Sequence, residues 1–79
     1  MPDDAKIEGA RLKEVLDSAL RLFGDAGRQY IMDDLAAHGI RFERGVFYNL
    51  SDVQKALSIL GEDGASLVIE RVRYEISRS

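Results

Sequence analysis

Apolar residues recur at helical spacing in two long stretches of this chain. Between Ile7 and Phe23 the apolar stripe consists of Leu12, Val15, Leu16, Ala19, Leu20 and Phe23, with spacings of three, four and seven that are typical of an amphipathic helix. Apolar residues from Leu50 onward repeat in the same way, and Ser51 with Gln54 matches the S-x-x-Q pattern that caps a helix N-terminus. These patterns predict a first and a third helix.

Glycines separate these two stretches from the apolar residues that follow each of them. Gly24 can end the first helix in the left-handed conformation, and Asp25 can cap a second helix that Gly39 closes. Gly61 and Gly64 bracket a turn before the last amphipathic segment. One long helix broken only at Gly39 is the alternative for the first half of the chain, but interior glycines at positions 24 and 27 would destabilise it.

The predicted fold is all-α, a compact four-helix domain with an extended linker between the second and third helices. The expected helices cover about residues 5–23, 25–38, 51–60 and 64–77. Residues 40–43 and 72–76 alternate apolar and polar side chains, so an α+β fold with two short strands at these places is the alternative. No internal repeat or domain linker is evident. Residues 1–79 are therefore expected to form a single small domain, with residues 1–5 frayed.

The chain is short and contains no cysteine. It has 79 residues, a formal net charge of -3 and one histidine. The core of so short a chain supplies only a few kcal/mol, and neither a disulfide nor a thiolate metal site can add to it. Self-association is another source of stability, so we expect a homodimer.

The charge pattern and the apolar runs bear on location. Acidic and basic residues are interspersed, which implies no global attraction to nucleic acid or to an anionic membrane. No apolar run is long enough to span a bilayer, and the acidic first ten residues do not match a secretory signal. We expect a cytoplasmic protein without a membrane partner.

No catalytic or cofactor-binding motif stands out. His38 falls at the end of a predicted helix, where a capping role explains it. Asp33 and Asp34 are adjacent, and neighbours on a helix point about 100° apart, so they do not converge on one substrate. The glycine patterns that bind phosphate are absent. We predict a non-enzymatic protein without a cofactor, a metal or catalytic residues.

Aromatic and apolar residues outside the main helical faces predict a binding surface. Phe47 and Tyr48 follow the linker, while Leu67 and Tyr74 are seven residues apart on a second stripe of the last helix, with Arg71 between them. Tyrosine and arginine are frequent anchors in protein interfaces. These five residues predict a regulatory module that binds a second copy or another protein. The alternative is that the last helix is buried on two sides.

Two other functions remain open. The first is a nucleic-acid-binding regulatory protein with two small basic patches that neighbouring glutamates dilute. Its candidate residues are Arg41, Arg44, Arg71 and Arg73. The second is a small-ligand pocket between helices near Phe42 and Phe47.

The segment from Val46 to Ile76 resembles a family of small archaeal domains known as the Nitrosopumilus output domain. The matching features are the aromatic loop at residues 46–48, the helix at 50–60, the turn LGEDGA at 60–65 and the apolar helix that follows. The resemblance covers under half of the chain. It implies a helical regulatory or output module and supplies no catalytic residue.

Overall fold

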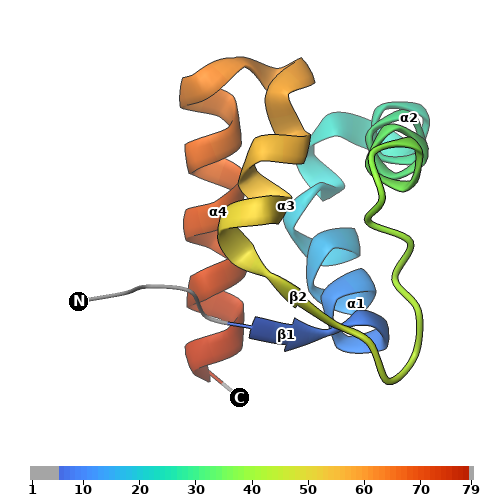
Figure 1. Ribbon diagram of the computed structural model, residues 1–79. Coiled ribbons are helices and arrows are strands. Elements are labelled where there is room, and N and C mark those ends of the chain that lie inside the picture. Colours follow the sequence, from blue (N-terminus) through green and yellow to red (C-terminus); the bar gives the residue numbers. More distant parts are fainter. Residues whose placement is uncertain (1–5, 79) are drawn as a thin grey trace.

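Helices surround one apolar core in the computed structural model, which describes residues 6–78 (Figure 1). In chain order the elements are β1 (Lys6–Glu8), α1 (Gly9–Ala19), the 3-10 helix η1 (Arg21–Phe23), α2 (Gly24–Ala37), β2 (Phe47–Asn49), α3 (Leu50–Ala56), the 3-10 helix η2 (Leu57–Leu60) and α4 (Gly61–Arg78). The radius of gyration is 11.4 Å, and a compact chain of this length has a value of about 11–12 Å. The prediction of a compact, mostly helical domain is confirmed. The predicted fraying of residues 1–5 lies outside the described residues.

The two strands form an antiparallel pair that the sequence patterns placed elsewhere. Lys6 pairs with Asn49, Ile7 with Tyr48 and Glu8 with Phe47. The prediction of one helix from about residue 5 to 23 is therefore wrong, because Ile7 is buried by pairing with a strand far away in the sequence.

The α+β alternative is also wrong in its positions. Residues 72–76 lie inside α4, where burial follows a helical period along Val68, Ile69 and Val72. Residues 40–43 lie in the loop between α2 and β2, and Phe42 has a positive φ of 57° that no strand would accommodate. The predicted extended linker corresponds to this loop, at residues 38–46.

The loop at 38–46 is fixed against the start of α1. A Cβ atom on Gly9 would lie 2.1 Å from the carbonyl oxygen of Glu43, so only glycine fits there. The Gly9 backbone N–H donates to the Val46 carbonyl at 2.8 Å. The Glu8 carboxylate accepts from the Gly45 N–H, also at 2.8 Å. A close backbone approach thus fixes the position of the loop.

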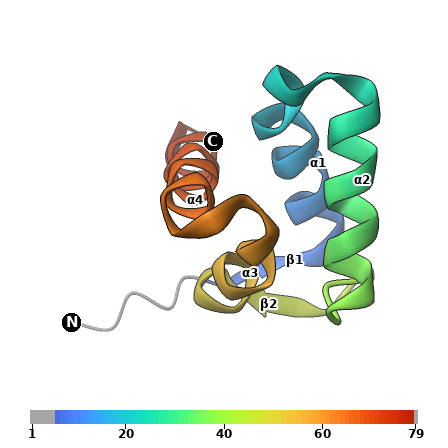
Figure 2. The same ribbon diagram turned by 90° about the horizontal axis from the view of Figure 1, so that it is seen from above.

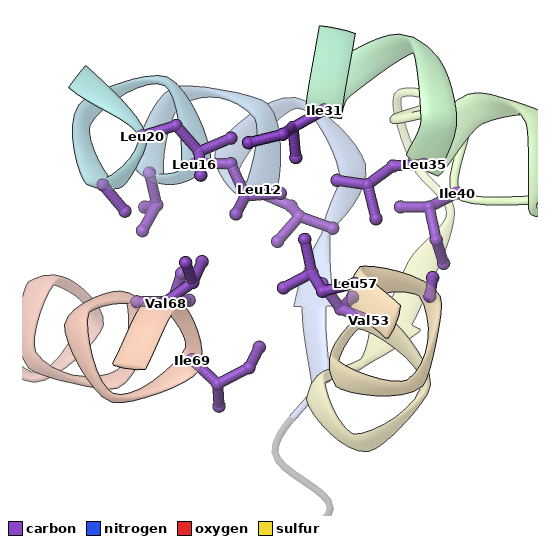
Figure 3. Packing of buried hydrophobic residues seen from close by; sticks show 14 of the residues in the cluster. Leu12, Leu16, Leu20, Ile31, Leu35, Ile40, Val53, Leu57, Val68 and Ile69 are labelled. Carbon is purple, nitrogen blue, oxygen red and sulfur yellow. The ribbon is translucent and has the colours of Figure 1, made fainter. Parts of the chain in front are cut away.

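Apolar side chains from all four α-helices meet in the core (Figure 3). The largest fully buried ones are Leu12, Leu16, Leu20, Leu35, Leu50, Leu57, Val53 and Val72. Seen from above, α4 and α2 lie on opposite sides, with α1 and α3 between them (Figure 2). Among residues 6–78, no polar or charged residue is buried. The hydrophobic effect therefore supplies most of the stabilisation.

The chain contains two copies of one structural unit, so the expectation that there is no internal repeat is wrong. Each unit runs strand, α-helix, 3-10 helix and α-helix. Residues 19–27 read ALRLFGDAG and residues 56–64 read ALSILGEDG, an offset of 37 positions. The glycine at each corner has the same conformation: Gly24 has φ 78° and ψ 170°, and Gly61 has φ 77° and ψ 171°. This region is accessible essentially only to glycine.

Burial and strand pairing both follow this repeat. Leu20 and Leu57 are equally buried 37 positions apart. The strands and the starts of the first helices differ by 41 positions instead, because α1 has 11 residues and α3 has 7. Ile7 pairs with its own counterpart, Tyr48, which is the register that a two-fold axis between the strands would give. The four extra residues of α1 break a constant sequence period, and this explains why the repeat was missed.

The start of α3 also differs from the prediction. The N-cap residue is Asn49 and the helix begins at Leu50, so Ser51 lies inside the first turn. The side chain of Gln54 donates to the Ser66 hydroxyl of α4 at 3.2 Å. Ser51 is therefore not the N-cap residue that the capping box requires, and Gln54 contacts α4.

Candidate interaction surface on α4

The outward side of α4 is solvent-exposed along its length. Its exposed residues at three- and four-residue spacing form what we name the outer face: Asp63, Leu67, Glu70, Arg71, Tyr74 and Arg78. Leu67 is 68% exposed and Tyr74 is 52% exposed. The alternative that α4 is buried on two sides is therefore wrong.

Tyr74 lies between two cations on the outer face. The guanidinium carbon of Arg71 is 5.2 Å from the Tyr74 ring centroid, and that of Arg78 is 5.6 Å away. Arg71 also forms an ion pair of 2.9 Å with Glu75. Exposed cation–π contacts contribute about 0.5–1 kcal/mol each. These contacts restrict the ring before anything binds, which lowers the entropy that binding would cost.

An apolar groove of about 520 Å³ runs between α4 and the corner formed by α1 and η1. It is lined by Ser18, Ala19, Arg21, Leu22, Phe23, Gly64, Leu67, Val68 and Arg71. Leu22 is the most exposed large apolar residue of the described chain, at 82%. The groove joins the outer face because Leu67 and Arg71 belong to both.

Leu22 and Phe23 were not among the predicted interaction residues. Phe23 was placed on the buried stripe of the first helix, but it belongs to η1 and is partly exposed. The available signal was the run from Ala19 to Phe23, which holds more apolar residues than one helical face can bury.

The structure separates the other two predicted residues from this surface. Phe47 is exposed on β2. Tyr48 packs against the core, and its hydroxyl accepts a hydrogen bond from the Glu43 N–H at 3.2 Å. Tyr48 therefore has a structural role in the strand pair. Neither Phe47 nor Tyr48 lines the groove beside α4. The contact role of Phe47 remains a prediction.

Two smaller clefts occupy equivalent places in the two units. The first is lined by Glu14, Asp17, Ser18, Arg21, Asp25 and Arg28. The second is lined by Ser51, Gln54, Lys55, Ser58, Gly61, Glu62 and Ala65. In the first cleft Arg28 donates to Asp17 at 2.9 Å and lies 3.6 Å from Asp25. Ala65 replaces this arginine in the second cleft, so the ion pairs are specific to one unit.

Two titratable groups, His38 and Glu8, have partners in the structure. The Nδ1 atom of His38 lies 2.8 Å from the Asp34 carbonyl oxygen at the end of α2, in agreement with a capping role. Backbone N–H groups, that of Gly45 foremost, hold the pKa of Glu8 below its ordinary value. Within residues 6–78, no three histidine, cysteine, aspartate or glutamate side chains gather in a way that could hold a metal ion.

The four arginines of the nucleic-acid alternative occupy two places. Arg41 and Arg44 lie in the loop at 38–46, whereas Arg71 and Arg73 lie on α4. The loop and α4 are on opposite sides of the molecule in both views (Figures 1 and 2). A single basic surface is therefore not formed by these four residues. Titration with duplex DNA at low salt tests this alternative.

None of the helices at residues 6–78 combines the length and apolar character needed to cross a bilayer.

Comparison of this chain with protein-family models, with curated proteins and with solved structures gives no match. The resemblance of residues 46–76 to the archaeal output domains consequently stays a prediction.

Proposed function

We propose that this protein is a non-enzymatic interaction module with a regulatory role, and that the outer face of α4 with its adjoining groove is the binding surface. A second copy of the chain is the first partner that we infer, and another protein is the second. The observation that supports this most is the pair Leu22 and Leu67, which flank one apolar groove while more than two-thirds of each residue is exposed. Contiguous exposed apolar surface marks binding sites in soluble proteins.

The expected gain from covering this groove follows from its leucines. Complete burial of a leucine side chain contributes about 1.5–3 kcal/mol. Because Leu22 and Leu67 are already partly covered, a partner would recover about 1–2 kcal/mol from each. Each 1.4 kcal/mol changes a dissociation constant about tenfold, so losing either contact should be measurable.

Light scattering across a concentration series tests the proposal. We expect Leu67→Asp to raise the dissociation constant of self-association at least about tenfold, because a carboxylate would have to be buried in an apolar groove. Tyr30→Asp is the matched control, since Tyr30 is the counterpart of Leu67 in the first unit and is 63% exposed on α2. Equal effects of both substitutions, or none from Leu67→Asp, would reject the surface on α4.

A further inference from the structure

The groove between α4 and the corner of α1 and η1 has the chemistry of a small-ligand site. We infer that it binds a medium-chain alkyl carboxylate, an apolar chain that ends in one negative charge. This inference goes beyond the proposed function, since it requires only the groove itself. The groove volume of about 520 Å³ falls within the range of about 300–1,000 Å³ that ligand pockets occupy.

The apolar part of the groove suits an alkyl chain. Leu22 and Phe23 of η1 line one side, and Leu67 and Val68 of α4 line the other. The lining residues of α4 begin at residue 64 and end at residue 71, a length of about 10 Å at 1.5 Å per residue. Since the two leucines are 82% and 68% exposed, they retain apolar surface that a chain would cover. Each methylene group that is covered should tighten binding about two- to fourfold.

One cation beside the groove has an uncompensated charge. The side chain of Arg21 forms no hydrogen bond or ion pair within residues 6–78. On the opposite side Arg71 already pairs with Glu75 at 2.9 Å. No acidic residue is found among the described residues that line the groove. A ligand with a single negative charge therefore complements the groove at the Arg21 end.

The acids of the neighbouring polar cleft do not supply that negative charge, because each of them has another partner. Asp17 and Asp25 lie 2.9 Å and 3.6 Å from Arg28, and Glu14 lies 3.6 Å from Arg11. Within the described chain, none of these carboxylates lies within 4.0 Å of the unpaired arginine. The cation is thus left for a ligand from outside.

Two polar side chains meet at this end of the groove. Ser18 and Arg21 line both the groove and the polar cleft, so they lie where the two join. The Ser18 hydroxyl has no hydrogen-bond partner in the part of the chain that the structure describes. A carboxylate placed here would accept from the hydroxyl and from the guanidinium, and such charge-assisted bonds are the stronger class. The alkyl chain would then extend along Leu22 and Leu67.

The other unit lacks this combination at the equivalent place, where α2 packs against α3 and η2. At an offset of 37 positions, Ser58 replaces Arg21 and Asp34 replaces Arg71. An aspartate there would repel a carboxylate, and the serine supplies no charge to attract one. We therefore expect one alkyl carboxylate per chain, although the fold contains two similar units.

Titration of the isotope-labelled chain with hexanoate, octanoate and decanoate tests the site by amide chemical shifts in NMR spectra. The largest changes should fall at residues 18–23 and 64–71, with a stoichiometry of one. Octanoate should bind about fourfold or more tighter than hexanoate, because it adds two methylene groups. Decanoate should gain less per methylene group, since its chain exceeds the length of the groove.

Substitution of the unpaired cation tests the role of the charge. Arg21→Gln should weaken octanoate binding about fivefold or more and leave the binding of 1-octanol, which has the same chain without the charge, within about twofold. Arg41→Gln is the matched control, because it removes an exposed arginine from the loop at 38–46. It should leave both affinities within about twofold of wild type.

The outcomes separate this inference from the proposed function. Shift changes spread over other faces, equal affinity for octanoate and 1-octanol, or an unchanged octanoate affinity in Arg21→Gln would overturn the carboxylate site. Absence of binding at millimolar decanoate would overturn it as well. None of these results bears on the proposed function, which is tested by the effect of Leu67→Asp on self-association without any added ligand.

Discussion

The substitution Gly9→Ala tests the contact that fixes the loop against α1. Its Cβ atom would lie 2.1 Å from the Glu43 carbonyl oxygen and 2.7 Å from the Glu43 nitrogen. Normal contact requires the loop to retreat by about 1 Å, because overpacking of backbone atoms cannot be relieved by a rotamer change. That retreat would stretch the 2.8 Å hydrogen bond from the Gly9 N–H to the Val46 carbonyl.

The expected change is a loss of about 2–3 kcal/mol in the free energy of unfolding. Overpacking contributes about 1–3 kcal/mol and a weakened hydrogen bond about 0.5–1.5 kcal/mol. The helix propensity of alanine offsets up to about 1 kcal/mol. A domain of this size has a total stability of about 4–12 kcal/mol. The melting temperature should therefore fall by about 10–20 °C.

Urea denaturation followed by circular dichroism measures this change, with an unaltered slope against denaturant showing that the folded state is retained. Gly27→Ala is the control, because it makes the same exchange in a helix. Its Cβ atom would only approach the Phe23 Cβ atom, at 3.1 Å. We expect its effect to lie within about 1 kcal/mol of zero. If the two variants were equally stable, the close approach at Gly9 would be refuted.

Two further predictions concern Glu8 and the core. The pKa of Glu8 is lowered chiefly by the Gly45 N–H, so its contribution to stability is present above the unfolded pKa and is lost as pH falls through the folded one. Between pH 7 and pH 3 the denaturation midpoint of wild type should drop more steeply than that of Glu8→Gln, and parallel curves would contradict this. Leu20 and Leu57 are at equivalent, fully buried positions. Replacing either with alanine should lower the free energy of unfolding by about 2–5 kcal/mol, measured by thermal or urea denaturation. If the free energy of unfolding fell by less than about 1 kcal/mol at either position, the two units would not contribute equivalent residues to the core.

Helical periodicity identified the faces that pack, because packing against one core imposes a period of three and four on each helix. The predicted apolar face of α4 is confirmed: Ala65, Val68, Ile69 and Val72 are buried, and Ile76 packs partly against the core. The same reasoning placed Leu67 and Tyr74 outside that face, and both are exposed. Their function in binding stays a prediction.

Features that depend on distant contacts could not be predicted in this way. Ile7 lies five residues before Leu12, off the helical period, and only its pairing with Tyr48 shows that it belongs to a strand. A strand of three residues also carries too little alternation to be distinguished from a loop. The groove was missed for a related reason, since periodicity within one helix does not show that Leu22 and Leu67 lie on the same cleft.

The duplicated architecture has a consequence for the size of an assembly. If both units carried the same adhesive helix, every molecule would offer two separate docking sites, and pairing could continue from molecule to molecule without limit. The counterpart of α4 is α2, where Tyr30, Asp33 and Asp34 take the places of Leu67, Glu70 and Arg71. The helix α2 therefore carries a tyrosine and two acids where α4 carries a leucine, an acid and an arginine. If α4 is the surface that associates, this divergence would leave one such surface in each molecule, and assembly would end at two molecules.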